Sequence, residues 1–565
     1  MKRRKWILPG ILLIVLVCLA AAFLIHRYAP SHETMSLKDY FKPQSDKDCA
    51  VILDGNYEAV KTGSPADGLI EGNRVYIRLP YLKKYADDAY VYDSTGGILR
   101  YATDSQLITV PVDSSSYTVD QTTESFDDKI LISENNAVYI CLDWVKNYTD
   151  LTYQLEKSPY RVVIETAGWE KTTAALRSSG QLRQYGGVKS RILSEVKKGD
   201  KVSVIENYGN WSKVLMKNGV IGCIQNRKLG KTGKETVKAS LPERNYQHLT
   251  VDKKISLAWH QVTSQAANNN LPSVLSGISG VNVLSPTWYV LSDNQGNVTD
   301  LSSLSYVADC HQKQIQVWAL VSNIGAKDVD STAVLNTTSS RDRLVNNLIT
   351  SAIRTKVDGI NIDLESLSSE ARDGYIEFIR EMALKCHQNG LILSVDNYIP
   401  TSSSEFYQRK EQAAFADYLI MMAYDEHYSG SKEAGSVASI DWVKNGIRKT
   451  LEDVPADQLV LGMPFYTRVW VTGTDGSLTS SAMGMLDALN YMQSNGAEIK
   501  WSDEDGQNYG SFEKDGKTYE CWLEDTKSLE LKLQAMQDSK LAGGAFWKLG
   551  MEDPSVWSLV SQYIQ

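Results

Sequence analysis

The residues best suited to chemistry lie in a short run from Asp358 to Glu365, which reads Asp-Gly-Ile-Asn-Ile-Asp-Leu-Glu. Successive side chains of a β-strand point to opposite faces, so Asn361, Asp363 and Glu365 share one face. A parallel strand inside a barrel has no solvated face, and carboxyl groups buried there are costly unless they serve a function. The pattern therefore predicts that the carboxyl groups of Asp363 and Glu365 serve a function.

The rest of the C-terminal region predicts the scaffold for this strand. From about residue 248 to 565, eight apolar, strand-like runs alternate with amphipathic helical stretches, as a (β/α)₈ TIM barrel requires. The runs begin at Ile255, Val281, Ile315, Gly359, Leu391, Tyr418, Leu459 and Gly544. Most of them end in polar or aromatic residues, where such a barrel places its active site.

Four motifs in this region resemble glycoside hydrolase family 18, the chitinase and N-acetylglucosaminidase family. They are the run 358–365, Met422-Ala423-Tyr424-Asp425, the segment 463–470 and Phe546-Trp547-Lys548-Leu549-Gly550. The likeness is strongest to the branch that includes spore-germination and cell-wall hydrolases. It implies a retaining glycosidase that acts on polymers containing N-acetylglucosamine and needs no cofactor.

The resemblance also implies roles for individual catalytic residues. Glu365 protonates the glycosidic oxygen, and the substrate's own 2-acetamido carbonyl attacks the anomeric carbon in place of an enzyme nucleophile. Asp363 orients that acetamido group and stabilises the positive charge on its nitrogen, while Tyr424 hydrogen-bonds the same group from across the barrel. Glu365 then activates water as a base.

Further residues are expected to bind sugar. Trp547 resembles the floor on which a sugar ring stacks, and Asp425 and Arg468 are expected to meet hydroxyl or acetamido groups. Strand-end positions add Trp288, Tyr289, Asn397 and Tyr398 as candidates for the cleft wall. The chain departs from the family at Asn361, where the family has Asp, which predicts weaker electrostatic coupling to Asp363.

The N-terminus predicts a membrane segment. Four cations in Met1–Lys5 precede 20 uncharged residues from Trp6 to Ile25, enough to span the hydrocarbon core of a bilayer. We expect residues 1–26 to be a basic tip and a transmembrane signal anchor that places the catalytic region outside the cell. A cleaved signal peptide, with Ala20–Ala22 as cleavage site, is the alternative and would give a secreted protein. Residues 27–48 are polar and are expected to form a linker.

Two smaller domains are expected between the linker and the barrel. Residues 49–167 form an α+β stalk with an internal repeat, because Val75–Leu79 recurs as Val138–Leu142 at an offset of 63. The stalk resembles the N-terminal domain of copper amine oxidases, without a histidine cluster. Residues 170–235 alternate like strands around the turns Gly199-Asp200 and Gly209-Asn210 and resemble a bacterial SH3-like domain, a module that binds cell-wall peptides. A spacer role is the alternative.

Composition narrows the classes of function. A net charge of −9 argues against a nucleic-acid binder, which needs clustered cations. The seven cysteines fall singly, so no metal-ligand spacing is present and we expect most of them to be small buried residues. The leading hypothesis is a membrane-anchored hydrolase of peptidoglycan. A chitinase or chitooligosaccharide hydrolase is one alternative, and a non-catalytic sugar-binding protein of the same fold is another.

Overall fold

The computed structural model describes residues 7–564, so the basic tip Met1–Lys5 and Trp6 lie outside the described residues. Helix α1 (Ile7–Tyr28) contains an exposed 20-residue stretch, Pro9–Tyr28, that is long and apolar enough to cross a membrane. The remaining chain divides into two compact units. The first comprises residues up to Tyr90 and Thr109–Glu243, and the second comprises Val91–Ile108 and Arg244–Gln565.

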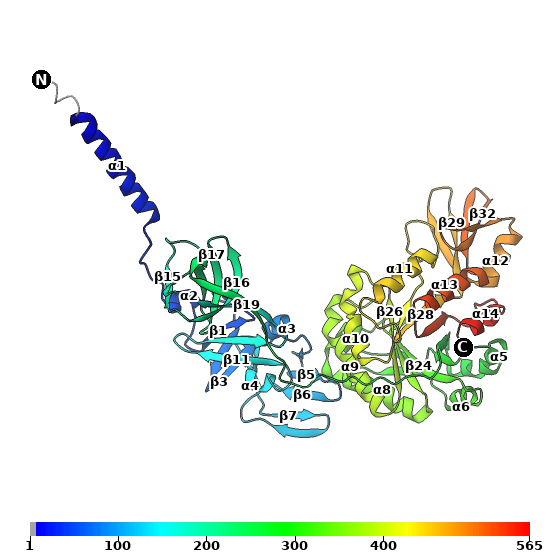
Figure 1. The fold of residues 1–565 in the computed structure, drawn as a ribbon. Helices are drawn as coiled ribbons and strands as arrows, with labels where there is room; N and C mark the ends of the chain where they lie inside the picture. Colours follow the sequence, from blue (N-terminus) through cyan, green and yellow to red (C-terminus); the bar gives the residue numbers. More distant parts are fainter. Residues whose placement is uncertain (1–6, 565) are drawn as a thin grey trace. The chain divides into compact units, whose positions relative to one another are not determined.

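Two seven-stranded sheets form the first unit (Figure 1). The first sheet has the order β11-β12-β1-β2-β3-β10-β9 and the second the order β15-β14-β18-β17-β16-β13-β19. The elements of the first sheet and its helices are β1 (Asp48–Leu53), β2 (Gly68–Glu71), β3 (Arg74–Arg78), α3 (Leu79–Tyr85), β9 (Leu131–Glu134), β10 (Ala137–Cys141), α4 (Leu142–Val145), β11 (Leu151–Glu156) and β12 (Arg161–Thr166). Strands β7 (Ser116–Val119) and β8 (Thr122–Ser125) pair antiparallel at one end of a further sheet and follow β6 (Leu107–Pro111).

The internal repeat is visible in the first sheet. Strands β3 and β10 each run directly into a helix, and they pair antiparallel with Ile77 opposite Ile140. These two isoleucines are 63 positions apart, so the strand pair is centred on the repeat that the sequence predicted.

The second sheet covers the predicted SH3-like region. Its elements are β13 (Glu170–Leu176), β14 (Gly180–Arg183), β15 (Ile192–Val196), β16 (Lys201–Tyr208), β17 (Trp211–Met216), β18 (Ile221–Gln225), η2 (Asn226–Lys228) and β19 (Leu229–Thr236). All pairings within it are antiparallel. The SH3-like and stalk assignments remain predictions.

Residues 27–48 are not the free linker that the sequence predicted. They contain α2 (Leu37–Phe41), and Met35 and Phe41 are buried in a core shared with Val163 of the first sheet and Val214 of the second. The segment is mostly polar, so its sequence did not indicate that these two apolar side chains would be buried.

The second unit contains the predicted barrel, and all eight predicted strands are confirmed. They pair in parallel in the order β21-β20-β34-β28-β27-β26-β25-β24, and β21 closes the ring against β24. The strands are β20 (Ile255–His260), β21 (Val283–Pro286), β24 (Gln316–Ser322), β25 (Gly359–Asp363), β26 (Ile392–Tyr398), β27 (Tyr418–Met422), β28 (Leu459–Pro464) and β34 (Gly543–Trp547). A short pair, β22 (Tyr289–Leu291) and β23 (Val298–Asp300), adds to β24.

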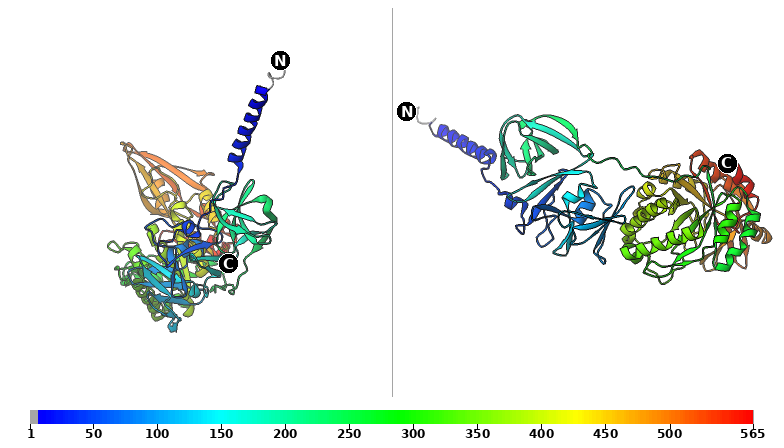
Figure 2. Two further views of the ribbon diagram at one scale, coloured as in Figure 1. Left: turned by 90° about the vertical axis from the view of Figure 1, so that its left-hand side faces the viewer. Right: turned by 90° about the horizontal axis from the view of Figure 1, so that it is seen from below.

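Helices surround the barrel strands (Figure 2, right). They are η3 (Gln265–Asn270), α5 (Leu271–Gly277), α6 (Leu304–Gln312), α7 (Ser331–Asn336), α8 (Thr338–Thr355), η4 (Ser369–Ala371), α9 (Arg372–Gln388), η5 (Ser402–Tyr407), α10 (Arg409–Phe415), α11 (Ile440–Thr450), α13 (Thr526–Asp538) and α14 (Val556–Tyr563). Inside the ring, Leu257, Trp318 and Ile420 belong to an apolar cluster that fills the barrel. Polar side chains therefore gather at the strands' carboxyl ends.

The sequence analysis missed an insertion between β28 and β34. It is a five-stranded antiparallel sheet, order β30-β29-β33-β32-β31, with α12 (Met485–Ser494) packed on one face (Figure 1). Its strands are β29 (Tyr466–Thr472), β30 (Leu478–Gly484), β31 (Glu498–Ser502), β32 (Gln507–Lys514) and β33 (Lys517–Leu523). Because β29 begins two residues after β28 ends, the segment 463–470 leaves the barrel for this sheet.

The hairpin of β4 (Val91–Asp93) and β5 (Ile98–Ala102) lies in the predicted stalk but belongs to the barrel's unit. Asp93 accepts a hydrogen bond of 2.8 Å from the amide of Thr338, at the start of α8, where Thr337 provides no side-chain cap. Arg100 forms a 2.7 Å ion pair with Asp342 on the same helix. The stalk boundary at 49–167 is corrected accordingly.

Replacing Asp93 by Ala should therefore destabilise the second unit by about 1 to 2 kcal/mol at neutral pH, the usual loss for an N-terminal cap. Burial alone would raise the pKa of Asp93, but amide hydrogen bonds from Gly96, Thr338 and Thr95 outweigh it and lower the pKa overall. Because the pKa of Asp93 is lower in the folded state, its ionised carboxylate stabilises the fold at pH values above the unfolded-state pKa, near 4. This stabilisation is lost as the pH falls from there through the folded-state pKa. Denaturant unfolding at pH 7 and pH 3 measures both effects.

The exposed Asp328 of the same unit provides the control. Asp328→Ala should leave unfolding unchanged at both pH values. Equal unfolding of the Asp93 and Asp328 variants at pH 7 would contradict the capping role.

Candidate active site

Strand β25 presents its polar residues to the barrel axis. Ile360, Ile362 and Leu364 belong to the core between strands and helices. Asp363 and Glu365 have the opposite parity and line a cavity of about 590 Å³ at the carboxyl ends of the strands. Asp358 points the other way, where it accepts a 2.8 Å hydrogen bond from the amide of Val317.

Glu365 is held just beyond the end of β25. Its backbone amide donates to Asn323 Oδ1 at 2.9 Å, and Asn323 Nδ2 returns a 2.8 Å hydrogen bond to its carbonyl. Ser366 follows with φ of 54°, so the chain turns away immediately after the carboxyl group. Tyr398 donates a 2.6 Å hydrogen bond to Glu365 Oε2. Burial raises the pKa of Glu365, Tyr398 opposes the rise, and the charge of Asp425 adds to it.

Asp363 lies deeper and is 5% exposed. Its Oδ1 atom is buried and has no hydrogen-bond partner among the described residues. Burial and the neighbouring Glu365 hold the pKa of Asp363 well above its ordinary value, while a hydrogen bond with Ser322 opposes the shift. A proton donor beside a second buried carboxyl group is the arrangement that general acid catalysis requires.

A third carboxyl group, Asp396 on β26, was missed by the sequence analysis. It is buried, lines the same cavity and accepts a 2.8 Å hydrogen bond from Asn361 Nδ2. Asp396 shares parity with Tyr398, so strict alternation along β26 would have identified it instead of Asn397. Asp396 therefore gives Asp363 the neighbouring carboxyl group that Asn361 cannot provide. The prediction of weaker electrostatic coupling at Asp363 is corrected accordingly.

Three further strand ends complete the cavity. Tyr424 and Asp425 follow β27, and Asp425, with φ of 62°, accepts a 2.6 Å hydrogen bond from Tyr466 at the start of β29. Arg468 on β29 lines the cavity with a buried Nε that has no partner among the described residues. Trp547 at the end of β34 packs edge-on against Trp259, with ring centroids 5.7 Å apart.

Three predicted cleft residues lie elsewhere. Trp288 and Tyr289 are fully buried behind the barrel strands. Trp288 donates a hydrogen bond to Asn268, and Tyr289 donates one to Ser351. The chain turns outward after β21 ends at Pro286, which carries both rings into the core. Asn397 faces the helix layer and exchanges two hydrogen bonds with Gln412, because its parity is opposite to that of Tyr398. Tyr398 does line the cavity, as predicted.

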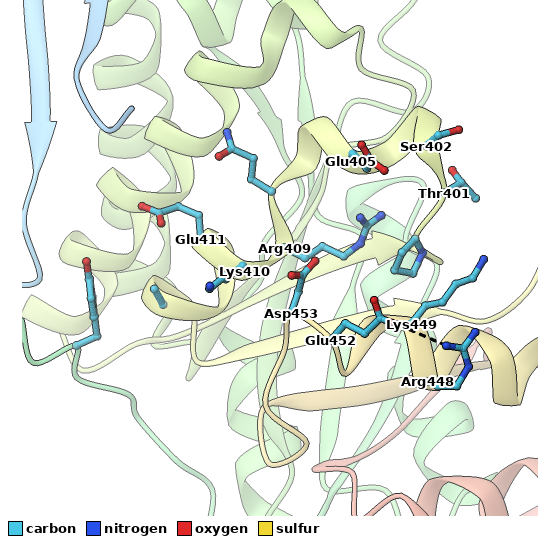
Figure 3. A pocket seen from close by; sticks show the side chains of 14 residues that line it. Thr401, Ser402, Glu405, Arg409, Lys410, Glu411, Arg448, Lys449, Glu452 and Asp453 are labelled. Carbon is cyan, nitrogen blue, oxygen red and sulfur yellow. Dashed lines mark hydrogen bonds and ion pairs between the residues drawn. The ribbon is translucent and has the colours of Figure 1, made fainter. Parts of the chain in front are cut away.

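A second, larger cavity of about 760 Å³ lies outside the barrel, between η5, α10 and the end of α11 (Figure 3). Cations and carboxylates alternate along it, and Arg448 and Glu452 form an exposed 3.4 Å ion pair there. Lys410 and Asp453 also line it. It contains none of the carboxyl residues at the ends of β25 and β26, so the candidate active site is the barrel cavity.

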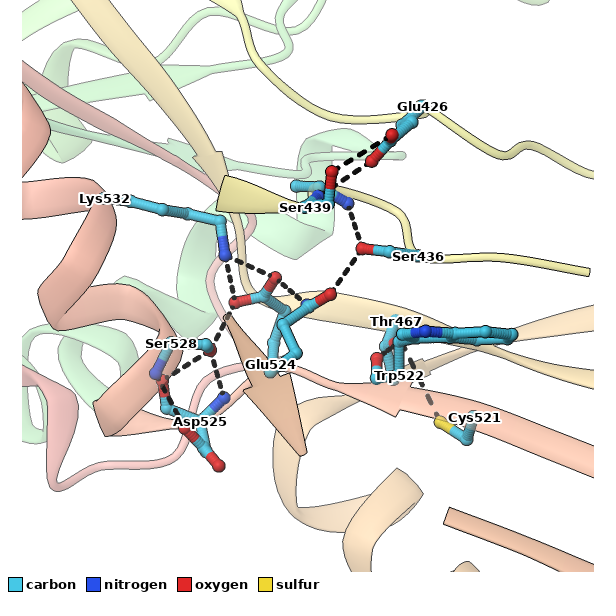
Figure 4. A network of polar contacts seen from close by, with 12 residues as sticks. Glu426, Ser436, Ser439, Thr467, Cys521, Trp522, Glu524, Asp525, Ser528 and Lys532 are labelled. Carbon is cyan, nitrogen blue, oxygen red and sulfur yellow. Dashed lines mark hydrogen bonds and ion pairs between the residues drawn. The ribbon is translucent and has the colours of Figure 1, made fainter. Parts of the chain in front are cut away.

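The loop between β27 and α11, which contributes Tyr428 and Ser429 to the barrel cavity, is fastened to the insertion (Figure 4). Ser436 donates to the side-chain oxygen of the buried Gln507, whose Nε2 donates to Glu524. Glu524 is fully enclosed and forms a 2.8 Å ion pair with Lys532 on α13. Burial raises the pKa of Glu524, and Lys532 opposes the rise.

A parallel eight-stranded barrel with a proton-donor carboxyl group beside a second buried carboxyl group at its carboxyl-terminal mouth is an arrangement that glycosidases use. Residues 258–552 match the family model described as glycosyl hydrolases family 18, more than half of the chain, and the chain belongs to this family. It is a family 18 glycosidase.

Curated relatives and a solved structure agree with this assignment. The chain is 26% identical over 263 residues to the Bacillus subtilis protein named uncharacterized glycosylase YvbX, covering 44% of this chain and 75% of that protein. It is 27% identical over 236 residues to the cortical fragment-lytic enzyme of Bacillus subtilis, covering 40% and 54%. The structure of the Bacillus cereus spore cortex-lytic enzyme SleL, 19% identical, superposes with a TM-score of 0.50 over 58% of this chain and 79% of that one, which supports the shared fold.

Replacing Gln507 by Leu should loosen the loop between β27 and α11. The change removes one partner each from Ser436 and from the buried Glu524, and an unsatisfied buried group costs about 1 to 3 kcal/mol. We expect a lower unfolding midpoint and a raised KM, because Tyr428 and Ser429 lose their fixed position. Unfolding and steady-state kinetics on a soluble glycan test this, with Gln534→Leu on the exposed side of α13 as control. Parental KM and stability in the Gln507 variant would contradict the fastening role.

Proposed function

We propose that this glycosidase cleaves N-acetylglucosamine-containing cell-wall glycan, with peptidoglycan as its polymer, by substrate-assisted retaining catalysis. The observation that carries the proposal is the enclosed pair Glu365 and Asp363 at the end of β25, with Tyr424 lining the same cavity. The relative named cortical fragment-lytic enzyme supports a wall polymer over chitin.

In the first step, Glu365 donates its proton to the glycosidic oxygen as the bond between that oxygen and the anomeric carbon breaks. Burial raises the pKa of Glu365, which favours the protonated form that can donate to the glycosidic oxygen. The acetamido carbonyl oxygen of the same sugar forms a new bond to the anomeric carbon from the opposite face. Asp363 accepts a hydrogen bond from the acetamido nitrogen, which becomes positively charged, and Tyr424 binds the acetamido group.

In the second step, Glu365 removes a proton from water as the water oxygen attacks the anomeric carbon. The bond to the acetamido oxygen breaks, and two inversions leave the configuration retained. Trp547 stacks on the sugar, while Arg468, Asp425 and Tyr398 line the cavity around it.

The N-terminal region would bring the barrel to its polymer. Helix α1 is proposed as a signal anchor that holds the catalytic unit outside the membrane. The sheet of residues 170–236 is proposed as an SH3-like domain that binds wall peptides, and the sheet containing β1 to β3 as the stalk. Tyr185 and Tyr208 of the SH3-like sheet are 67% and 50% exposed and offer it a binding surface.

Glu365→Gln tests the catalytic assignment. The amide keeps the shape of the side chain but cannot donate a proton in the same way, so turnover of soluble N-acetylglucosamine oligomers should fall by about 10²-fold or more. Glycan affinity, measured by calorimetry, should survive. The matched control is Glu405→Gln, an exposed residue of the second cavity, which should keep parental turnover. Turnover within threefold of the parent for Glu365→Gln would overturn the assignment.

Tyr185→Ala and Tyr208→Ala together test the role of the SH3-like sheet. A second binding site on one chain raises apparent affinity for a polymer by about 10²-fold when both sites can be occupied. The double variant should therefore pellet less with wall sacculi and cleave them more slowly, yet cleave soluble oligomers at the parental rate. Ile353→Ala, which removes an exposed apolar side chain from α8 of the second unit, is the control. Unchanged pelleting would reduce the sheet to a spacer.

A further inference from the structure

The amide of Asn361 has only one possible orientation. Trp259 Nε1 and Ser285 Oγ each lie 3.0 Å from Asn361 Oδ1, and an indole N–H can only donate. Oδ1 is thus the acceptor, and Nδ2 must be the group that donates to Asp396 Oδ1 at 2.8 Å. Asn361 can accept no proton, and Asp396 is fixed in place with its carboxyl group in the cavity.

Asp363 and Asp396 share this cavity and are 5% and 4% exposed. Asp363 Oδ1 is buried and has no hydrogen-bond partner among the described residues. Two neighbouring carboxyl groups removed from water do not both ionise, because like charges in a poorly solvated site repel strongly. A single proton shared between them resolves this conflict.

Other titratable groups also lie near Asp396. They are Glu365 just beyond β25, Tyr424 after β27 and Tyr375 on α9. Of these, Glu365 is the other carboxyl group, and its proton goes to the glycosidic oxygen in the proposed function. Among the residues that line the cavity, Arg468 on β29 is the cation. Asp396 thus has Asp363 as its carboxyl partner and no lysine or arginine in hydrogen-bond contact among the described residues.

We propose that Asp396 is the proton partner of Asp363: the two carboxyl groups hold one proton between them, and Asp396 takes it when the acetamido group attacks. This deepens the proposed function and rests on it. As the acetamido oxygen bonds to the anomeric carbon and the glycosidic bond breaks, the leaving oxygen takes the proton of Glu365. The acetamido nitrogen keeps its hydrogen and becomes positive. Asp363 faces it as a carboxylate, and the shared proton resides on Asp396.

The electrostatics agree with the geometry. Burial raises the pKa of Asp396 well above its ordinary value, the charges of Asp363 and Glu365 add to the rise, and the hydrogen bond from Asn361 opposes it. The pKa of Asp363 is likewise raised well above its ordinary value, so both carboxyl groups resist ionisation. Sharing a proton also favours the singly ionised pair, as in other carboxyl dyads.

The structure permits an exchange experiment, because the hydrogen bond between residues 361 and 396 can be reversed. In Asp396→Asn, the new amide oxygen still accepts from Asn361, so the bond survives and only the carboxyl group is lost. In the double variant Asn361→Asp/Asp396→Asn, residue 361 accepts from Trp259, Ser285 and residue 396, and a carboxyl group again lies beside Asp363. Unfolding curves identify any variant that fails to fold.

The measurement is the pH profile of kcat/KM for the full chain on a soluble N-acetylglucosamine oligomer. In Asp396→Asn, Asp363 must lose its proton to water, so the acidic limb should move up by about one pH unit, a tenfold loss of rate below the limb. The double variant should return the limb toward its parental position. A parental limb in folded Asp396→Asn, or a folded double variant that matches Asp396→Asn, would overturn the proposal. Glu365→Gln tests the proposed function separately. If Glu365→Gln loses activity, the catalytic role of Glu365 stands whatever the Asp396 variants show. If Glu365→Gln keeps parental activity, the catalytic role of Glu365 is overturned instead.

Discussion

The barrel mouth is organised around the free-energy cost of keeping carboxyl groups out of water. Glu365, Asp363 and Asp396 lie at the ends of two adjacent strands, and all three have raised pKa values, chiefly through burial. In water these groups would be anions at neutral pH and useless as proton donors. The apolar packing of the barrel interior, with Trp318 and Ile420 below the polar layer, creates the environment that shifts them.

The surrounding hydrogen bonds decide which group carries which charge. Tyr398 donates to Glu365, Ser322 to Asp363 and Asn361 to Asp396, so each carboxyl group has one dedicated partner. The insertion adds a second level of order. Through Gln507 it fixes the loop between β27 and α11, whose Tyr428 and Ser429 line the cavity. The cavity at the ends of β25 and β26 therefore depends on a residue 144 positions after Asp363 in the chain.

Alternation along strands made much of this predictable. It placed Asn361, Asp363 and Glu365 on one face, and the eight apolar runs gave the barrel. The same rule, left unapplied on β26, would have replaced Asn397 by Asp396. Trp288 and Tyr289 could not be placed this way, because they follow the turn after β21, where periodicity ends. The insertion also escaped, because the segment 463–470 resembled a barrel-strand motif, whereas β29 within it belongs to the antiparallel sheet. The association of residues 91–108 with the barrel's unit depends on tertiary contacts such as Arg100 with Asp342, which no local pattern encodes.

The claim that the substrate supplies its own nucleophile is the centre of this account, and one comparison tests it most directly. Two soluble oligomers of equal length, one of N-acetylglucosamine and one of glucosamine, differ in the N-acetyl group, whose carbonyl oxygen attacks the anomeric carbon in this account. Product formation from each is measured by mass spectrometry with the same enzyme preparation. The account predicts cleavage of the acetylated oligomer and none of its unacetylated counterpart. Comparable cleavage of both would contradict it, because an enzyme group would then have to form the bond assigned to the acetamido oxygen.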